Sequence, residues 1–304
     1  MERQILVPLD GSLLAETVLP HAALLARATD SHLTLLQTLL APALIAPMVG
    51  VLPPAFVTAQ FLEADPQVAQ NYLTPVAQRL EAAGLVVRTL VVEGDPATTM
   101  VAWAAQDPPQ RRIAIATHGR SGLSRWVFGS VAEKVIQAAP CPILLVRAER
   151  DAQIQQLPAR PYHRIVVPLD GSALAERALN QAGPLALAAQ ASLLLVTVVS
   201  PGDDPIASVE GLPQSAEARR QGVEQLEHYL QTVAERLRSM GVTVETRIAY
   251  GQPAEGILHC SAEADGDLIV IASHGRSGLQ RFWLGSVALK VVQSAQRPVL
   301  LVRM

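Results

Sequence analysis

Two stretches of the chain carry the same glycine-rich, arginine-bearing pattern, and their residue types suit the binding of an anion. The first reads A-T-H-G-R-S-G-L-S-R-W-V-F-G-S over residues 116–130, and the second reads A-S-H-G-R-S-G-L-Q-R-F-W-L-G-S over residues 272–286. Each follows an apolar run and leads into an amphipathic segment, which places it between a strand and a helix. Free amides and the helix dipole favour anions at a helix N-terminus. The pattern therefore indicates a phosphate site, and its repetition indicates two.

The repeat extends over almost the whole chain. The run I-L-V-P-L-D-G-S at 5–12 returns as I-V-V-P-L-D-G-S at 165–172, and P-I-L-L-V-R at 142–147 returns as P-V-L-L-V-R at 298–303. Because the order of the motifs is unchanged, the chain is a tandem duplication. We expect one domain over residues 1–147, a linker over 148–162 and a second domain over 163–304. A length of 304 residues allows each domain its own core.

Composition and charge argue against several classes of protein. Half of the residues are hydrophobic, 17% are charged and the net charge is -3, so nothing favours a nucleic-acid partner. Cys141 and Cys260 stand at non-equivalent positions, and they indicate neither a disulfide framework nor a metal-ligand cluster. The first residues lack the pattern of a signal peptide. We therefore expect a cytoplasmic protein.

One segment, residues 33–62, carries no Asp, Glu, Lys or Arg and is long enough to cross a membrane. Prolines at 42, 47, 53 and 54 interrupt it, and an interior proline costs a helix about 3 kcal/mol. This favours a buried strand followed by an apolar loop over 41–62, without a membrane partner.

Strand and helix patterns alternate along each copy. In the first copy, strand patterns at 5–9, 33–40, 85–92, 111–117 and 143–147 alternate with helical patterns at 13–28, 68–83, 97–106 and from Ser130 onward. This alternation predicts an α/β fold: two tandem, doubly wound, five-stranded parallel sheets with helices on both faces. In such a sheet a ligand binds beyond the carboxyl ends of the strands, where the strand order reverses. We expect the P-L-D-G-S turn and the glycine-rich loop to line one pocket there.

These motifs resemble the universal stress protein family, whose nucleotide-binding members carry G-x2-G-x9-G-[S/T] after the fourth strand and an aspartate at the end of the first. The last two glycines and the final serine of that pattern are present in both copies, whereas Ala116 and Ala272 replace its first glycine. Alanine adds a methyl and disfavours positive φ, so the change is mild where the backbone is strand-like. The resemblance implies the adenine nucleotide alpha hydrolase-like, flavodoxin-like strand order, ATP as ligand, and a pseudo-twofold pair of domains within one chain.

The resemblance also implies which residues line the nucleotide. They are Pro8, Leu9, Asp10, Thr38, Ala116, His118, Gly119, Arg120, Gly129, Ser130 and Val131 in the first copy, and Pro168, Leu169, Asp170, Val198, Ala272, His274, Gly275, Arg276, Gly285, Ser286 and Val287 in the second. The two aspartates would hydrogen-bond ribose or adenine, or hold a magnesium ion through water. The main chain at the end of the second strand would meet the adenine edge. The serines would cap the following helix, and the glycine amides and loop arginines would meet the phosphates.

Simpler alternatives stand beside these roles. The Asp-Gly-Ser motifs are also suited to turns and helix caps alone, and loop arginines are often solvated. His118 and His274 have no nucleophile with an orienting acid at a recognisable spacing, which favours a structural role. The chain's two lysines, Lys134 and Lys290, lie one helical turn beyond the serines. Each is either a packed stem with a solvated head or a charge that supports the phosphate end or pairs across the domain interface.

The sequence lacks G-x-x-x-x-G-K-[ST] and a second carboxylate poised near either aspartate, so neither a P-loop NTPase nor a two-metal enzyme is indicated. We expect an ATP-binding, nucleotide-responsive stress protein without dedicated catalytic machinery. The alternatives are a scaffold or interaction protein in which one or both pockets are lost, and a slow ATP hydrolase. Association into a homodimer through the apolar loop after Leu40 stays open.

Overall fold

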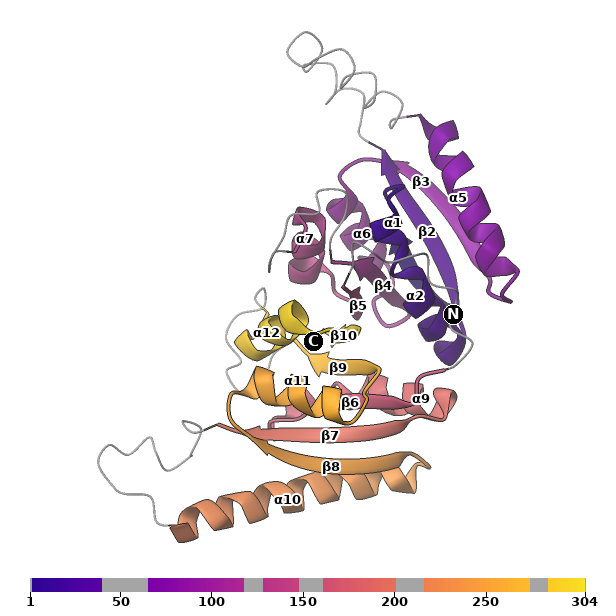
Figure 1. Ribbon diagram of the computed structural model, residues 1–304. Helices are drawn as coiled ribbons and strands as arrows, with labels where there is room; N and C mark the ends of the chain where they lie inside the picture. The colour runs from indigo at the N-terminus through magenta and orange to yellow at the C-terminus, as the bar shows by residue number, and fades with distance from the viewer. Residues whose placement is uncertain are drawn as a thin grey trace, which may run out of the picture. The chain divides into compact units, whose positions relative to one another are not determined.

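The structure, a computed structural model, describes residues 2–39, 65–117, 128–147, 161–200, 216–273 and 284–303 (Figure 1). The chain divides into two compact units, Met1–Ala159 and Arg160–Met304. The apolar segment 41–62 and residues 148–160 of the predicted linker lie outside the described residues.

Strands and helices alternate in the first unit as the sequence predicts. Its elements are β1 (Arg3–Pro8), α1 (Leu13–Glu16), α2 (Leu19–Thr29), β2 (Ser31–Leu39), α5 (Pro66–Glu81), β3 (Val87–Glu93), α6 (Pro96–Ala105), β4 (Arg111–Ala116), α7 (Ser130–Ala138) and β5 (Ile143–Val146). Local signals set several boundaries. Pro96 opens α6 because its missing N–H is not needed there, and the Asp95 side chain accepts the Thr98 amide at 2.9 Å.

The second unit repeats this order. Its elements are β6 (Arg164–Pro168), α8 (Ala173–Glu176), α9 (Leu179–Ala189), β7 (Ser192–Val199), α10 (Ala216–Ser239), β8 (Thr243–Tyr250), α11 (Pro253–Glu263), β9 (Leu268–Ala272), α12 (Ser286–Ser294) and β10 (Val299–Val302). The helix before the third strand is the clearest difference in length, because α10 has 24 residues and α5 has 16.

Each unit contains a five-stranded parallel sheet whose strand order reverses beside its first strand. The order is β3-β2-β1-β4-β5 in the first unit and β8-β7-β6-β9-β10 in the second. The chain builds outward from β1 to β3 and then returns to the other side of β1, where β4 pairs parallel to it. The unit 2 pairings, β6 with β7 and β6 with β9, are the same. This confirms the doubly wound fold and places the switch point between the first and fourth strands.

Helices cover both faces of each sheet. In the first unit α2 packs on β1 and β2, α5 packs on β2 and β3, and α6 packs against α7. Figure 1 shows α5 running beside β2 and β3, and α10 in the same position beside β7 and β8. Because crossovers between parallel strands are right-handed, the reversal of direction after β3 moves α6 and α7 to the face opposite α2 and α5. The central strands are therefore apolar on both sides, and Ile5, Leu6 and Val7 of β1 are fully buried.

The predicted helix at 13–28 is two helices instead of one. The amides of Thr17 and Val18 bond to carbonyls three residues earlier, which tightens the backbone between α1 and α2. Pro20 is not the cause, because the second unit breaks at the same place with Asn180 in the equivalent position. Apolar spacing alone did not reveal this break, since both halves keep the helical periodicity. Within the ranges given above, no helix is long and apolar enough to cross a membrane.

Candidate nucleotide site

The strand-end turn of the first unit is built around Asp10. Its Oδ1 accepts hydrogen bonds from the Ser12 amide at 2.9 Å and the Ser12 hydroxyl at 2.6 Å, while Ser12 Oγ accepts the Ala15 amide at 3.1 Å. Gly11 lies at φ 81°, in the left-handed region that glycine adopts without strain. Asp10 thus shapes the turn and Ser12 caps α1, which accounts for the D-G-S sequence in structural terms.

The second unit reproduces this turn closely. Asp170 Oδ1 accepts the Ser172 amide at 3.0 Å and the Ser172 hydroxyl at 2.6 Å, and Ser172 Oγ accepts the Ala175 amide at 3.1 Å. Gly171 has φ 83°. Both strand-end aspartates are partly exposed at the carboxyl edge of their sheets.

The end of β4 and the start of α7 are joined directly. The Gly129 amide donates to the Thr117 carbonyl oxygen at 3.0 Å, and the Thr117 amide donates to Val146 of the neighbouring strand at 2.9 Å. The first bond inside α7 runs from the Glu133 amide to the Gly129 carbonyl at 3.0 Å. The first amides of a helix have no acceptor within it, and those of Ser130 and its successors begin beside the end of β4 because Gly129 is bonded there. They form the positive pole expected of a phosphate site.

The second unit has the same junction. The Gly285 amide donates to Ser273 O at 2.7 Å, and the Leu289 amide closes the first turn of α12 on the Gly285 carbonyl at 2.8 Å. Because β4 pairs with β1 and β9 pairs with β6, each helix start lies at the edge where the strand-end aspartate turn also lies. The convergence of two distant motifs on one edge of each sheet follows from the strand order.

The capping role predicted for Ser130 and Ser286 is wrong. The N-cap residues are Gly129 and Gly285, with φ of -58° and -57°, and the serines are the first helical residues. The mistake arose because Ser is a preferred cap whereas Gly is also accepted there. The serine hydroxyls are consequently not committed to capping. Val131 and Val287 follow them in the first turn of each helix.

The described part of the fold does not require glycine at position 129. Its φ is accessible to any residue, and a Cβ built at this position would meet no described atom closer than the Thr117 carbonyl oxygen at 3.7 Å. A glycine that neither the backbone nor the packing demands fits a position that a ligand approaches closely.

The substitution of alanine for the first motif glycine is mild. Ala116 is the last residue of β4 and pairs with Val146, and Ala272 is the last residue of β9 and pairs with Val302. Strand backbone does not need glycine. The backbone at both positions is therefore compatible with alanine in place of glycine.

The remaining predicted site residues are spread around the same edge or fall outside the described ranges. Thr38 and Val198 are the penultimate residues of β2 and β7 and are partly exposed. Pro8 and Pro168 end the first strands, and the following Leu9 and Leu169 are buried. His118, Gly119, Arg120, His274, Gly275 and Arg276 lie outside the described residues.

Lys134 pairs within its own unit. Its Nζ lies 3.7 Å from Asp95 Oδ1 at the start of α6, and both side chains are largely exposed. The equivalent of Asp95 in the second unit is Gln252, which carries no charge to offer Lys290.

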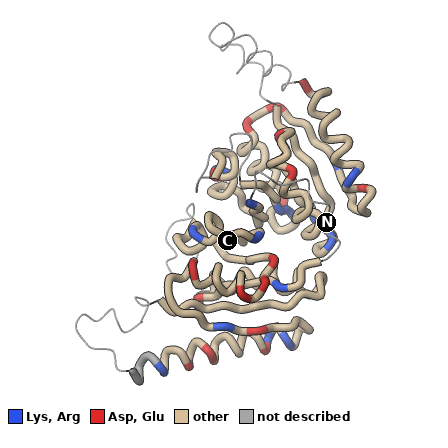
Figure 2. Tube along the Cα trace, viewed as in Figure 1, with Lys and Arg blue, Asp and Glu red and all other residues tan. Residues whose placement is uncertain are grey.

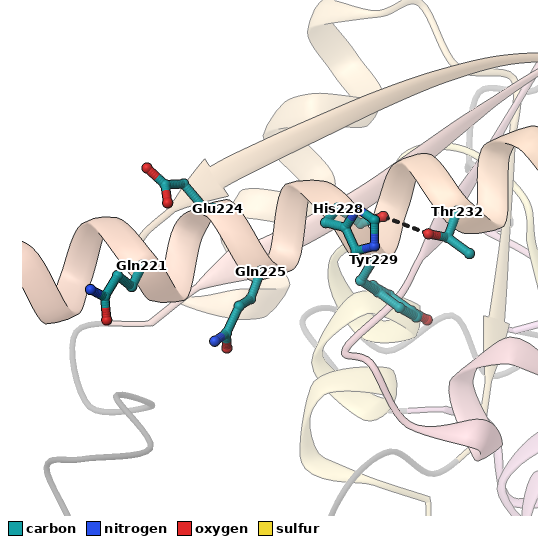
Figure 3. A pocket seen from close by; sticks show the side chains of 6 residues that line it. All are labelled: Gln221, Glu224, Gln225, His228, Tyr229 and Thr232. Atoms are coloured by element: carbon teal, nitrogen blue, oxygen red, sulfur yellow. Dashed lines mark hydrogen bonds between the residues drawn. The ribbon is translucent and has the colours of Figure 1, made fainter.

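An open groove of about 620 Å³ lies along α10, and none of the predicted site residues is among its described lining residues. It is lined by Gln221, Glu224, Gln225, His228, Tyr229 and Thr232. Figure 3 shows Gln221, Gln225 and Tyr229, spaced four residues apart, projecting from one side of the helix. These are polar side chains on a helix that carries both acidic and basic residues along its length (Figure 2). The groove's described lining comes from α10 alone and includes no helix start, which distinguishes it from the nucleotide pocket that the motifs predict.

A three-residue network near the strand-end turn was missed by sequence reasoning. Glu16, the last residue of α1, accepts the Tyr72 hydroxyl at 3.1 Å and Arg79 Nη2 at 2.7 Å. The Glu16 side chain is only 8% exposed. Burial raises the pKa of Tyr72, and the negative charges of Glu16 and Asp10 add to this while Arg79 opposes it. Tyr72 therefore lies within the electrostatic reach of the aspartate turn.

The chain's relatives agree with this architecture. The sequence matches the profile of the universal stress protein family twice, over residues 1–147 and 161–303, and the chain belongs to that family. A universal stress protein of Mycolicibacterium smegmatis is 27% identical over 310 residues, which cover 99% of this chain and 97% of that one. Universal stress protein YxiE of Bacillus subtilis is 35% identical over 151 residues, covering 47% of this chain and 99% of its own length.

A solved structure shares the fold across both units. The crystal structure of a universal stress protein from Archaeoglobus fulgidus superposes with a TM-score of 0.70 at 20% identity, covering 99% of this chain and 98% of that one. At this identity the likeness establishes the fold alone.

Proposed function

We propose that each unit binds an adenine nucleotide, ATP, at the carboxyl ends of its first and fourth strands, and that the chain is a nucleotide-responsive stress protein without dedicated catalytic machinery. The observation that carries the proposal is the start of α7 and α12. Each follows an N-cap glycine beside the strand that pairs with the aspartate-bearing strand, at the sheet's switch point. Oriented amides and a helix dipole at this place favour phosphate.

Different residues at this edge of the sheet would contact the phosphates, the ribose and the adenine. The phosphates would approach the amides from Ser130 or Ser286 onward, because these follow an N-cap that carries no side chain. The ribose would face the partly exposed strand-end turn, where Asp10 or Asp170 supplies a carboxylate. The adenine would lie against the main chain at the ends of β2 and β7, near Thr38 and Val198.

Magnesium fits this arrangement as a companion of the nucleotide. Mg²⁺ is usually held through one or two carboxylates and substrate phosphates, with water completing its shell. One carboxylate stands at each strand-end turn, and no cluster of three or more His, Cys, Asp or Glu side chains occurs within the described ranges. The aspartates would contact the ion through water, and the ion would neutralise phosphate charge. This donor set suits binding better than a catalytic metal pair.

Calorimetric titration of the nucleotide-free protein tests the proposal. ATP should bind with a stoichiometry of up to two per chain, and AMP should bind more weakly because it lacks the phosphates that reach the helix start. Magnesium should alter ATP affinity more than AMP affinity. Absence of binding to a cooperatively folded, nucleotide-free chain would defeat the proposal and favour the scaffold alternative.

A further inference from the structure

The Glu16 network recurs in the second unit with the same residue types and the same contacts. Glu176 accepts the Tyr229 hydroxyl at 3.2 Å and Arg236 Nη2 at 2.8 Å. Burial raises the pKa of Tyr229, and the negative charges of Glu176 and Asp170 raise it further. Both networks thus join the end of the short helix after the aspartate turn to the long helix before the third strand.

The pattern of identity between α5 and α10 distinguishes this network from ordinary core packing. Aligned from Tyr72 with Tyr229, residues 66–81 and 223–238 share Tyr, Leu, Val, Ala, Arg and Leu. The leucines, valine and alanine are buried in both helices and form the core: Leu73, Val76, Ala77, Leu80, Leu230, Val233, Ala234 and Leu237. The tyrosine and arginine are the two shared types that are not fully buried, and both contact the glutamate.

A continuous chain of contacts links each glutamate to the strand-end aspartate. The Asp10 carboxylate accepts hydrogen bonds from the Ser12 amide and hydroxyl, and the Ser12 hydroxyl accepts one from the Ala15 amide. The Glu16 amide donates to the Ser12 carbonyl oxygen at 3.3 Å. The short helix α1 has only four residues, so one anchored end restricts its other end. A helix of one turn has little stability of its own, and tertiary contacts must hold it.

We propose that Glu16 and Glu176 are positioning residues of the two nucleotide sites, each fixing the strand-end aspartate turn through the tyrosine and arginine of the long helix. This inference rests on the proposed function. The glutamates do not contact the nucleotide; they hold Asp10 and Asp170 where the ribose or the hydrated metal ion meets them. A site held in this way loses less conformational freedom on binding.

The experiment uses the full chain and two conservative double variants. E16Q/E176Q removes the charge that holds the arginine, and Y72F/Y229F removes only the hydroxyl. The matched control is E263Q, which breaks a carboxylate–arginine pair with Arg247 at 3.0 Å that joins α11 to β8 and does not involve a strand-end turn. Calorimetry measures ATP affinity, and hydrogen exchange without nucleotide measures protection of peptides 10–16 and 170–176.

ATP affinity should fall about tenfold in E16Q/E176Q, a typical effect of losing a partner that orients a ligand-binding group. The same variant should exchange faster in both turn peptides, while E263Q should match the wild type in affinity and turn exchange. Y72F/Y229F should show the same changes more weakly. Wild-type affinity or wild-type turn exchange in E16Q/E176Q overturns the positioning role and leaves the proposed function standing. Absence of ATP binding to the wild-type chain overturns both.

Discussion

The amide of Gly129 donates to the carbonyl oxygen of Thr117 at 3.0 Å, although eleven residues separate the two in sequence (118–128). This bond places the start of α7 directly against the end of β4. The equivalent bond from Gly285 to Ser273 does the same for α12 and β9. In both units, therefore, a backbone hydrogen bond joins the described ends of the glycine-rich stretch and holds the start of the helix against the end of the strand.

The first prediction concerns Gly129 and Gly285. Serine is at least as good an N-cap as glycine, and φ near -58° suits it, so G129S/G285S should keep or raise the free energy of unfolding by a few tenths of a kcal/mol. The added side chain would nevertheless occupy the approach to the first amides, and ATP affinity should fall at least tenfold. Denaturant unfolding and calorimetry on the same sample measure both. Full ATP affinity would mean that the phosphates bind elsewhere.

A second prediction concerns the alanines that replace the first motif glycine. Because Ala116 and Ala272 lie in strand backbone, A116G/A272G should lower the free energy of unfolding by about 0.5–1 kcal/mol per site through backbone entropy. Removing the methyl widens the edge next to the proposed adenosine, so ATP affinity should rise a few-fold. Weaker binding in this variant would show that the methyl packs favourably against the ligand.

The sequence predicted the elements well where local signals agree. The apolar runs gave the strands because parallel strands are buried on both faces, and Asp95 with Pro96 marked the start of α6 because capping is a local interaction. The motif order gave the switch point because few topologies accommodate strict alternation. Gly129 was harder, since a glycine and a serine in succession both suit an N-cap and only the backbone shows which one is outside the helix.

The Glu16 network could not be predicted from local pattern, because its partners stand 56 and 63 positions away in the sequence. A usable signal was nevertheless present in the duplication. Tyr72 and Arg79 recur at matched positions in the second copy without belonging to its apolar face. Side chains that persist outside the fully buried face of a helix in two diverged copies indicate a shared partner, and in this fold that partner is the glutamate.

A third prediction separates the two networks by burial. Glu16 is 8% exposed and Glu176 is 27% exposed, so removing the arginine leaves a less solvated carboxylate in the first unit. R79A should lower the free energy of unfolding by about 1–2 kcal/mol, a fraction of the cost of a fully buried unpaired charge because Arg79 itself is 41% exposed. R236A should cost less than about 1 kcal/mol. Equal costs in denaturant unfolding would contradict the role given to burial.

A fourth prediction separates two functions of Asp95. Its carboxylate caps α6 through the Thr98 amide and hydroxyl and also lies 3.7 Å from Lys134. The Thr98 bonds, more than the lysine, lower the pKa of Asp95. D95A should therefore cost about 1 kcal/mol through the lost cap, whereas K134A should cost less than about 0.5 kcal/mol because the ion pair is exposed. K134A should also leave ATP affinity unchanged. Weaker ATP binding in this variant would indicate that the positive charge of Lys134 supports the binding of the phosphates.

The last prediction concerns pH. Burial lowers the pKa of His21 in α2 to about 4, from an ordinary value of 6.5. The folded chain thus binds fewer protons than the unfolded chain between these two pH values. The contribution of His21 to the free energy of unfolding is therefore highest above pH 6.5 and decreases as the pH falls towards 4. The shift in the pKa of His21 would lower the free energy of unfolding by about 3 kcal/mol for a fully buried ring. The loss should be smaller here because the ring is partly exposed.

The second unit supplies the matched substitution, since Gln181 stands at the position equivalent to His21. H21Q should flatten the fall in unfolding free energy between pH 6.5 and 4 while leaving stability at pH 7.5 within about 1 kcal/mol of the wild type. Urea denaturation across this pH range measures the slope. An unchanged slope in H21Q would assign the acid sensitivity to other groups, such as carboxylates that lose ion pairs.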